Sequence, residues 1–321
     1  MVQGGVVFAS ELKALRRFPG FDNLIDRDAL AAYLRFAYVP EPWSIHEGIY
    51  KLEPGCRLTL TREGVTNLPS DPPRAPTDAP GLSLRRWWSL HRVVAAGEAT
   101  PLEDETAAVD MLEARLRESI RLQSIADVPL GAFLSGGVDS STIVALMQSE
   151  AVTPVRTFTI GFEDTAHDEA IHARAVARHL GTDHTELYVT PREALDVIPQ
   201  LPRLYDEPFA DSSQIPTFLV CCQARRQVTV ALSGDAGDEL FGGYNRYLRA
   251  RRIRTMLAWM PWSVRQAMIR LILSQSVARW DALGGWLNVG MNLLGNRLHK
   301  LSEGLSGVRD LDAFYYNLVS A

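Results

Sequence analysis

The stretch 128–149, VPLGAFLSGGVDSSTIVALMQS, constrains the fold of this chain more than any other. Its first seven residues, Val128 to Leu134, are mostly apolar and uncharged, which predicts a short buried strand. An apolar pattern with helical spacing follows from Ile143 to Met147. The heptapeptide SGGVDSS joins the two elements. We therefore expect a glycine turn and a helix N-terminus at the end of a buried strand.

Such a turn favours anion binding. Two glycines let the backbone turn tightly and turn N–H groups outward, and the helix N-terminus adds unpaired donors and a partial positive charge. Three serine hydroxyls add further donors. A carboxylate beside a phosphate is repelled unless a cation lies between them, so Asp139 implies a divalent metal, Mg²⁺ foremost. The alternative at this point is a plain strand–turn–helix in which Asp139 and the serines cap the helix.

A second polar stretch, SGDAGDELFGGY, directly follows an apolar run, QVTVAL, at 227–232. It places Asp235, Asp238 and Glu239 within five residues. Three close carboxylates repel one another unless some bind a cation or a proton. The alternative is that Asp238 and Glu239 only favour the start of a helix. Asp206 to Ser213, DEPFADSS, is a further polar cluster, and alone it would more often be a solvated loop.

Composition limits the partners. The chain has 321 residues, a formal net charge of −5 and no basic stripe, so no nucleic-acid partner is expected. Neither a signal peptide nor an apolar run of about 18 residues is evident, which argues against a membrane partner. Three cysteines, Cys56, Cys221 and Cys222, do not form a disulfide framework. They fit a reducing cytoplasm.

The middle of the chain alternates between two kinds of element. Apolar strands are predicted at 155–162, 186–189 and 227–232, with helices between them and an amphipathic helix over 103–124. This alternation predicts a parallel sheet covered on both faces. Ligands of such sheets bind beyond the carboxyl ends of the strands, where the polar clusters at 135–141, 161–168 and 233–238 fall.

The first hundred residues have a different pattern. We expect a strand at 5–10, a short helical turn at 11–17, and a helix capped by Asp26 or Asp28. A hairpin is expected from 49–52 and 57–60 around Glu53-Pro54-Gly55. Residues 65–100 are rich in proline and polar residues, as in a linker, with Trp87-Trp88 packed against a domain.

Several of these motifs resemble known families. SGGVDSS resembles the pyrophosphate-binding loop of the N-type ATP pyrophosphatases. SGDAGDELFGGY resembles the second signature motif of asparagine synthetases, SG[ED]GxDELFGGY. VVFASELKALRRFPGF and the stretch from DRDALAAYLRF to CRLTL resemble the end of the glutaminase domain of glutamine-hydrolysing asparagine synthetases, a class II amidotransferase domain.

The resemblance implies a fold and a domain order. The fold is α/β, with a parallel-sheet ATP pyrophosphatase domain preceded by the remnant of an N-terminal-nucleophile glutaminase domain. We assign residues 1–65 to the glutaminase remnant, 66–102 to a linker and 103–321 to an incomplete synthetase domain.

The resemblance also implies roles for single residues, with ATP and Mg²⁺ as ligands. Catalytic roles fall to Ser135, Asp139 and Asp235, and metal binding to Asp139 and Asp238. Ala236 stands where the family usually has glycine, so a positive φ there would bring strain. The positions implied in nucleotide binding are Phe133, Ser135, Gly136, Gly137, Asp139, Ser140, Ser141, Ile160, Ser233 and Gly234.

The implied activity is amidation of aspartate through β-aspartyl-AMP, with ammonia supplied from glutamine in the full-length protein. Three alternatives stay open: a β-lactam synthetase-like enzyme, an amidotransferase of a natural-product or polysaccharide cluster, and a non-catalytic nucleotide-binding fragment. The oligomeric state is open as well, a homodimer among the options.

The ends of the chain lead to a prediction. Met1-Val2 offers no N-terminal cysteine nucleophile, and the family continues beyond Ala321 with an essential lysine and aspartate-binding residues. We therefore expect a fragment that hydrolyses no glutamine and makes little or no asparagine even from ammonia, because lost donors typically cost about a hundredfold or more in rate. Assays of glutaminase activity and of aspartate-dependent pyrophosphate release test this. Robust turnover in either would contradict it.

Overall fold

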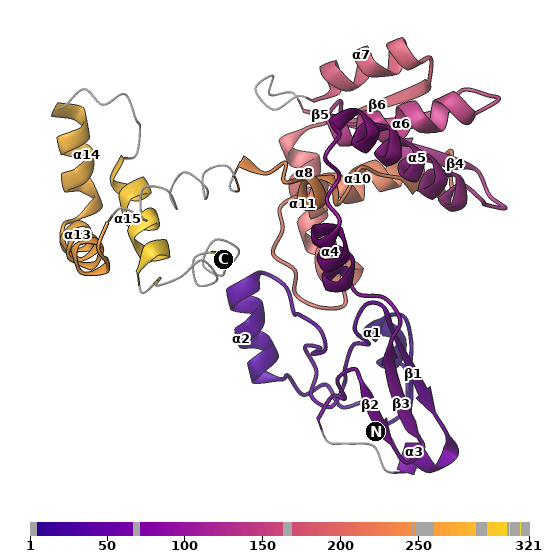
Figure 1. Ribbon diagram of the computed structural model, residues 1–321, viewed down its shortest axis with the longest axis horizontal. Helices are drawn as coiled ribbons and strands as arrows, with labels where there is room; N and C mark the ends of the chain where they lie inside the picture. The colour runs from indigo at the N-terminus through magenta and orange to yellow at the C-terminus, as the bar shows by residue number, and fades with distance from the viewer. Residues whose placement is uncertain are drawn as a thin grey trace. The chain divides into compact units, whose positions relative to one another are not determined.

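The computed structural model describes residues 5–66, 71–162, 169–245, 247, 260–286, 294–306, 308 and 315 (Figure 1). The chain divides into two compact units, Met1–Asp235 and Ala236–Ala321. The first unit contains both sheets, and each unit is described by itself below.

A parallel sheet of four strands organises the first unit. Its strands are β4 (Leu130–Phe133), β5 (Arg156–Phe162), β6 (Asp183–Val189) and β7 (Val230–Leu232). They lie in the order β6-β5-β4-β7, and every neighbouring pair is parallel. The parallel sheet predicted from the alternation of strands and helices is confirmed.

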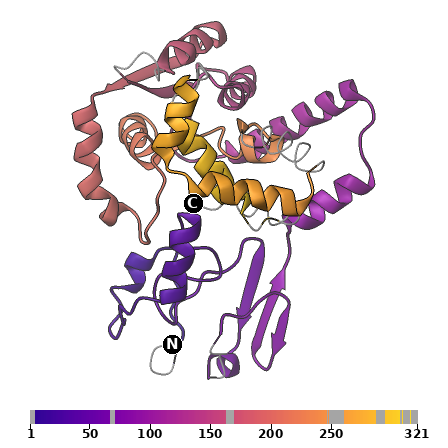
Figure 2. The same ribbon diagram turned by 90° about the vertical axis from the view of Figure 1, so that its left-hand side faces the viewer.

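Helices cover both faces of this sheet (Figures 1 and 2). On one face, α5 (Glu105–Gln123), α6 (Val138–Glu150) and α7 (Ala170–Leu180) share a core with Ala132 of β4 and with Leu134, the residue after this strand. The intervening Phe133 points the other way and joins a second cluster with Phe158, Val228 and α10 (Gln214–Ala224). This alternation of side chains along β4 divides the core into two layers.

Local signals set several helix ends as predicted. Asp26 caps α2 (Arg27–Phe36) by accepting the N–H groups of Asp28 and Ala29. Gly181 ends α7 in the left-handed region, with φ of 72°. Thr190 and Glu193 form a capping box at α8 (Pro191–Val197), whose first residue is proline. The 3-10 turn η1 (Ile198–Gln200) and α9 (Leu201–Leu204) follow α8.

The first hundred residues differ from expectation. The strand expected at 5–10 does not form, although α1 (Leu12–Leu15) does. In place of the expected hairpin, β1 (Cys56–Leu60) pairs antiparallel with β3 (Leu82–Arg86), which pairs with β2 (Thr77–Ala79). Residues 49–52 provide only an isolated bridge between Tyr50 and Trp43.

The segment expected as a linker therefore has structure of its own. It contains β2, β3 and α4 (Leu90–Ala99), and α3 (Arg62–Thr66) lies just before it. Leu82 and Leu84, on one face of β3, are buried, so burial on this face outweighs the proline-rich composition. Trp87 and Trp88 are 74% and 45% exposed, so the packing predicted for them is wrong in this structure.

The second unit is helical where it is described. It contains α11 (Gly237–Phe241), α13 (Trp262–Ser274), α14 (Val277–Trp286) and α15 (Leu294–Leu305). Within the described parts of both units, none of the helices combines the length and apolarity needed to span a bilayer. Residues 163–168, most of the predicted polar cluster after β5, lie outside the described residues.

Ala236 precedes α11 with φ of 71° and ψ of 0°, so the positive φ suspected from the sequence is present. The left-handed region costs an L-residue about 1 kcal/mol or more, and glycine avoids this cost. We expect Ala236→Gly to raise the free energy of unfolding of this part by about 0.5 kcal/mol, since glycine also gains entropy in the unfolded chain. Thermal unfolding measures the change. Ala95→Gly in the exposed middle of α4 is the control and should destabilise by about 1 kcal/mol. An unchanged or lower midpoint for Ala236→Gly would contradict the prediction.

Candidate functional site

The predicted anion loop lies where β4 ends and α6 begins. Gly136 has φ of 80°, and a Cβ built there would lie 2.7 Å from both the Ala173 amide nitrogen and the His172 Cβ. Gly136 therefore meets two requirements that only glycine satisfies: the left-handed backbone and the close approach of α7. The loop is held tightly between two helices.

The serines of the loop divide into two roles. Ser140 Oγ accepts the Ser135 N–H at 3.2 Å, lies 2.9 Å from Ser135 Oγ and donates to the Gly137 carbonyl at 3.3 Å. Ser140 thus stabilises the turn from within. Ser141 Oγ is also buried but has no hydrogen-bond partner. A buried hydroxyl without a partner is uncommon, and a bound phosphate oxygen would satisfy it.

The order of the strands places a second loop beside the first. The chain runs outward from β4 to β5 and β6 and then returns to β7 on the other side of β4. Such a reversal opens a crevice at the carboxyl ends of the two strands, here β4 and β7. Ser135 follows β4, and Ser233 follows β7. The two predicted clusters therefore meet at the switch point of the sheet.

Gly234 makes the contact between these loops. A Cβ built on Gly234 would lie 2.6 Å from the Ser140 amide nitrogen and 3.0 Å from the Asp139 carbonyl carbon. The backbone of the β7 loop therefore packs against the first turn of α6. Asp235 Oδ2 accepts a hydrogen bond from Ser233 Oγ at 2.9 Å, and Asp235 is exposed.

The two apolar residues predicted to contact the nucleotide share one face of the sheet. Phe133 is the register partner of Phe158, and Ile160 lies two residues further along β5. Residues two apart in a strand point to the same face, so Phe133 and Ile160 lie on the side covered by α10. Both are partly buried.

The other predicted metal ligand belongs to the second unit. Asp238 lies in the first turn of α11, and its carbonyl accepts the Gly243 N–H at 3.0 Å. The convergence of Asp139 and Asp238 on one ion stays a prediction. Mg²⁺ in nucleotide sites is commonly held by one or two carboxylates together with phosphates, so Asp139 at an anion loop fits such an ion. No cluster of three or more His, Cys, Asp or Glu that could hold a metal occurs in the described ranges.

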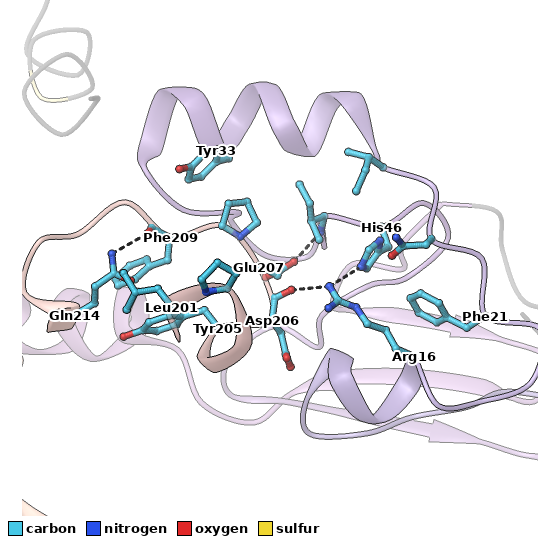
Figure 3. A pocket seen from close by; sticks show the side chains of 15 residues that line it. Arg16, Phe21, Tyr33, His46, Leu201, Tyr205, Asp206, Glu207, Phe209 and Gln214 are labelled. Carbon is cyan, nitrogen blue, oxygen red and sulfur yellow. Dashed lines mark hydrogen bonds between the residues drawn. The ribbon is translucent and has the colours of Figure 1, made fainter. Parts of the chain in front are cut away.

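The polar cluster at 206–213 contacts the N-terminal part of the same unit. There it lines a pocket of about 710 Å³ together with residues of 16–46 (Figure 3). Arg16 Nη2 donates to the Asp206 carbonyl at 3.0 Å and lies 3.1 Å from His46 Nε2. Burial and the Arg16 charge lower the pKa of His46, which favours the neutral ring.

The sequence did not single out Arg16 or His46. Each stands about 160 or more residues from the segment it faces across the pocket, and each lies in a stretch that resembles the glutaminase domain as a whole, without a role assigned to it alone. The polar run Asp206-Glu207 was the one sequence signal for this pocket. The residues that it contacts could not be found from the periodicity of the sequence.

The fold and the two loops define an α/β protein of the ATP pyrophosphatase class. Comparison with family models extends this: residues 111–310 match the asparagine synthase model, and residues 1–70 match a glutamine amidotransferase domain. The chain belongs to the asparagine synthase family.

Several curated proteins similar to this chain are named asparagine synthetases. Asparagine synthetase [glutamine-hydrolyzing] 1 of Bacillus subtilis is 33% identical over 75% of this chain and 34% of its own length. A putative asparagine synthetase of Mycobacterium tuberculosis is 36% identical over 83% of this chain and 38% of its own. One from Methanocaldococcus jannaschii is 33% identical over 77% and 44%. The matches thus span less than half the length of these relatives.

A solved structure also aligns with part of the chain. An NMN synthetase from Francisella tularensis covers 43% of this chain and 59% of its own, at 13% identity and a TM-score of 0.31. The family assignment rests on the family models and the curated relatives.

Gly234 generates a prediction. Because an added Cβ would meet the backbone of α6 rather than a movable side chain, we expect Gly234→Ala to push the β7 loop off the helix N-terminus. ATP affinity should fall by about tenfold or more, as for misplaced positioning groups. Titration calorimetry with Mg-ATP measures the loss. Gly97→Ala, at a position with nothing within 4 Å of the added Cβ, is the control. Equal ATP affinity of both variants and the unaltered chain would contradict the role of Gly234.

Proposed function

We propose that this chain carries the ATP-binding part of an enzyme that amidates aspartate. In this reaction the side-chain carboxylate of aspartate attacks the α-phosphorus of ATP and forms β-aspartyl-AMP, while the bond to pyrophosphate breaks. Ammonia then attacks the acyl carbon, AMP leaves, and asparagine forms. Membership of the asparagine synthase family supports this function. The observation that carries it is the meeting of the Ser135–Ser141 loop and the Ser233–Asp235 loop at the switch point.

The residues of the loops account for the handling of pyrophosphate. The first N–H groups of α6 and the helix dipole would stabilise an anion bound at the carboxyl end of β4. Ser135 and Ser141 add hydroxyl donors, and the glycine at 234 lets the second loop approach closely. Donors arranged in advance stabilise the charge that grows on the departing pyrophosphate. Asp139 and Asp238 would hold Mg²⁺, which supplies further neutralisation of phosphate charge.

The remaining groups are assigned by their place in the sheet and by the family. Phe133 and Ile160 would contact the adenine, on the α10 side of the strand ends. Asp235, exposed beside the β7 loop, is proposed to act in the ammonia step. The amidotransferase match at residues 1–70 supports glutamine as the source of ammonia in the longer protein.

Asp139 provides the decisive test. Asp139→Asn keeps the size of the side chain but removes the charge that an Mg²⁺ ion needs, so we expect magnesium-dependent ATP binding to disappear while the fold persists. Calorimetric titrations of ATP with and without Mg²⁺, together with a thermal melt, measure both properties.

A matched variant supports the comparison. Asp110→Asn makes the same change on an exposed position of α5 and should leave binding unaltered. If Asp139→Asn binds Mg-ATP as well as the Asp110→Asn control does, Asp139 is not in the site and the proposed mechanism is wrong.

A further inference from the structure

The loop 205–213 between α9 and α10 is attached to residues far from it in the sequence. Arg16 Nη2 donates to the Asp206 carbonyl at 3.0 Å, and the Lys13 N–H donates to Asp206 Oδ2 at 3.2 Å. Further along, the Ala210 N–H donates to the carbonyl of Ala37 at 2.8 Å. All three partners lie in the segment that matches the amidotransferase domain.

Glu207 makes the strongest of these attachments. Its Oε1 accepts the Ile45 N–H at 2.7 Å, and its Oε2 lies 2.5 Å from Lys51 Nζ. The Glu207 side chain is 17% exposed and that of Lys51 is 28% exposed, so water screens the pair only in part. Lys51 Nζ also donates to the Val39 carbonyl at 2.7 Å. Both carboxylate oxygens of Glu207 therefore bind residues of the amidotransferase segment, and Figure 3 shows Glu207 within the pocket lining.

Towards α10, the hydrogen bonds of the loop within the described part of the chain are local. The Ser213 N–H donates to Asp211 Oδ1 at 2.8 Å, and Gln214 Nε2 donates to the Phe209 carbonyl at 3.3 Å. These contacts join the loop to the start of α10, a helix that also packs against β5 and α8. Among the described residues, the hydrogen bonds that join the loop to distant parts of the sequence all go to the amidotransferase segment.

Helix α10 connects loop 205–213 to the sheet. Val220 and Ala224, near its carboxyl end, pack in the cluster that includes Phe133 and Phe158. A helix of 11 residues is a stiff rod about 16 Å long, so a displaced start moves the far end as well. Phe133 stands two residues before Ser135, the first residue of the anion loop, and lies on the face proposed for adenine.

We propose that Glu207 is a positioning residue for the nucleotide site: through it, the amidotransferase segment holds loop 205–213 and, through α10, the Phe133 side of the site. This inference rests on the proposed function for the location of the adenine. It makes the amidotransferase segment a structural part of the ATP site, in addition to the part in ammonia supply proposed for the longer protein.

Hydrogen exchange tests the attachment. Glu207→Ala removes both contacts, so amide exchange in peptides covering 43–47 and 206–213 should accelerate together by about tenfold, the effect expected on losing a charged hydrogen bond. Glu207→Gln keeps an acceptor for the Ile45 N–H and should show a smaller increase at 43–47. Glu113→Gln, which removes an exposed ion pair to Arg117 on α5, is the matched control and should change neither peptide.

Ligand binding tests the positioning role. We expect Glu207→Ala to raise the Kd of Mg-ATP by about fivefold while the Kd of magnesium triphosphate, which lacks the adenosine, stays within about twofold. A general loss of folded protein would weaken both ligands equally. The Kd of Mg-ATP for Glu207→Gln should lie between the values for the unaltered chain and for Glu207→Ala.

Each outcome decides a separate point. Unchanged exchange in Glu207→Ala, or equal losses for ATP and triphosphate, would overturn the inference. If the unaltered chain binds neither ligand, the proposed function fails, and the exchange experiment still decides whether Glu207 holds the loop: joint acceleration supports the attachment, and its absence refutes it.

Discussion

The approach of the β7 loop to the first turn of α6 is the contact on which the site depends. Gly234 lies so close to the Ser140 amide that a methyl group would not fit between them. This contact is available because β7 pairs with β4 on the side opposite β5. The reversal of strand order opens the crevice, and the helix N-terminus gives it a positive end. Glycine at 234 lets the β7 loop approach the start of α6, and glycine at 136 lets the β4 loop approach α7.

The N-terminal part of the chain is attached to loop 205–213 of the same unit through polar contacts. Its own core is small, with Ala29, Val39 and Ile45 at the centre. Its attachment to loop 205–213 uses an ion pair and hydrogen bonds to backbone groups. Such contacts are directional, so they define position more strictly than an apolar patch would. This favours a positioning role for the segment over passive packing.

Sequence reasoning succeeded where a local cause determined the structure. The strand before the anion loop, the stop at Gly181 and the cap at Asp26 each follow from residues within one turn of the element. It failed where pairing partners were distant in sequence. Residues 57–60 were expected to pair with 49–52, but β3 provides a better partner because its buried leucines alternate. β3 was not predicted because it lies in a proline-rich segment that was expected to be a linker.

The sequence by itself determined the parallel sheet and the family, because these depend on regular alternation and on short motifs. It also indicated the strain at Ala236, because alanine stands there at a position where the family usually has glycine, and the strain depends on the φ angle of that one residue. Only the tertiary structure decided that Gly234 meets Ser140, that Phe133 and Ile160 share a face with α10, and that Glu207 binds Ile45 and Lys51. Those contacts join residues up to 162 positions apart, and no local pattern encodes which distant backbone group a side chain will reach.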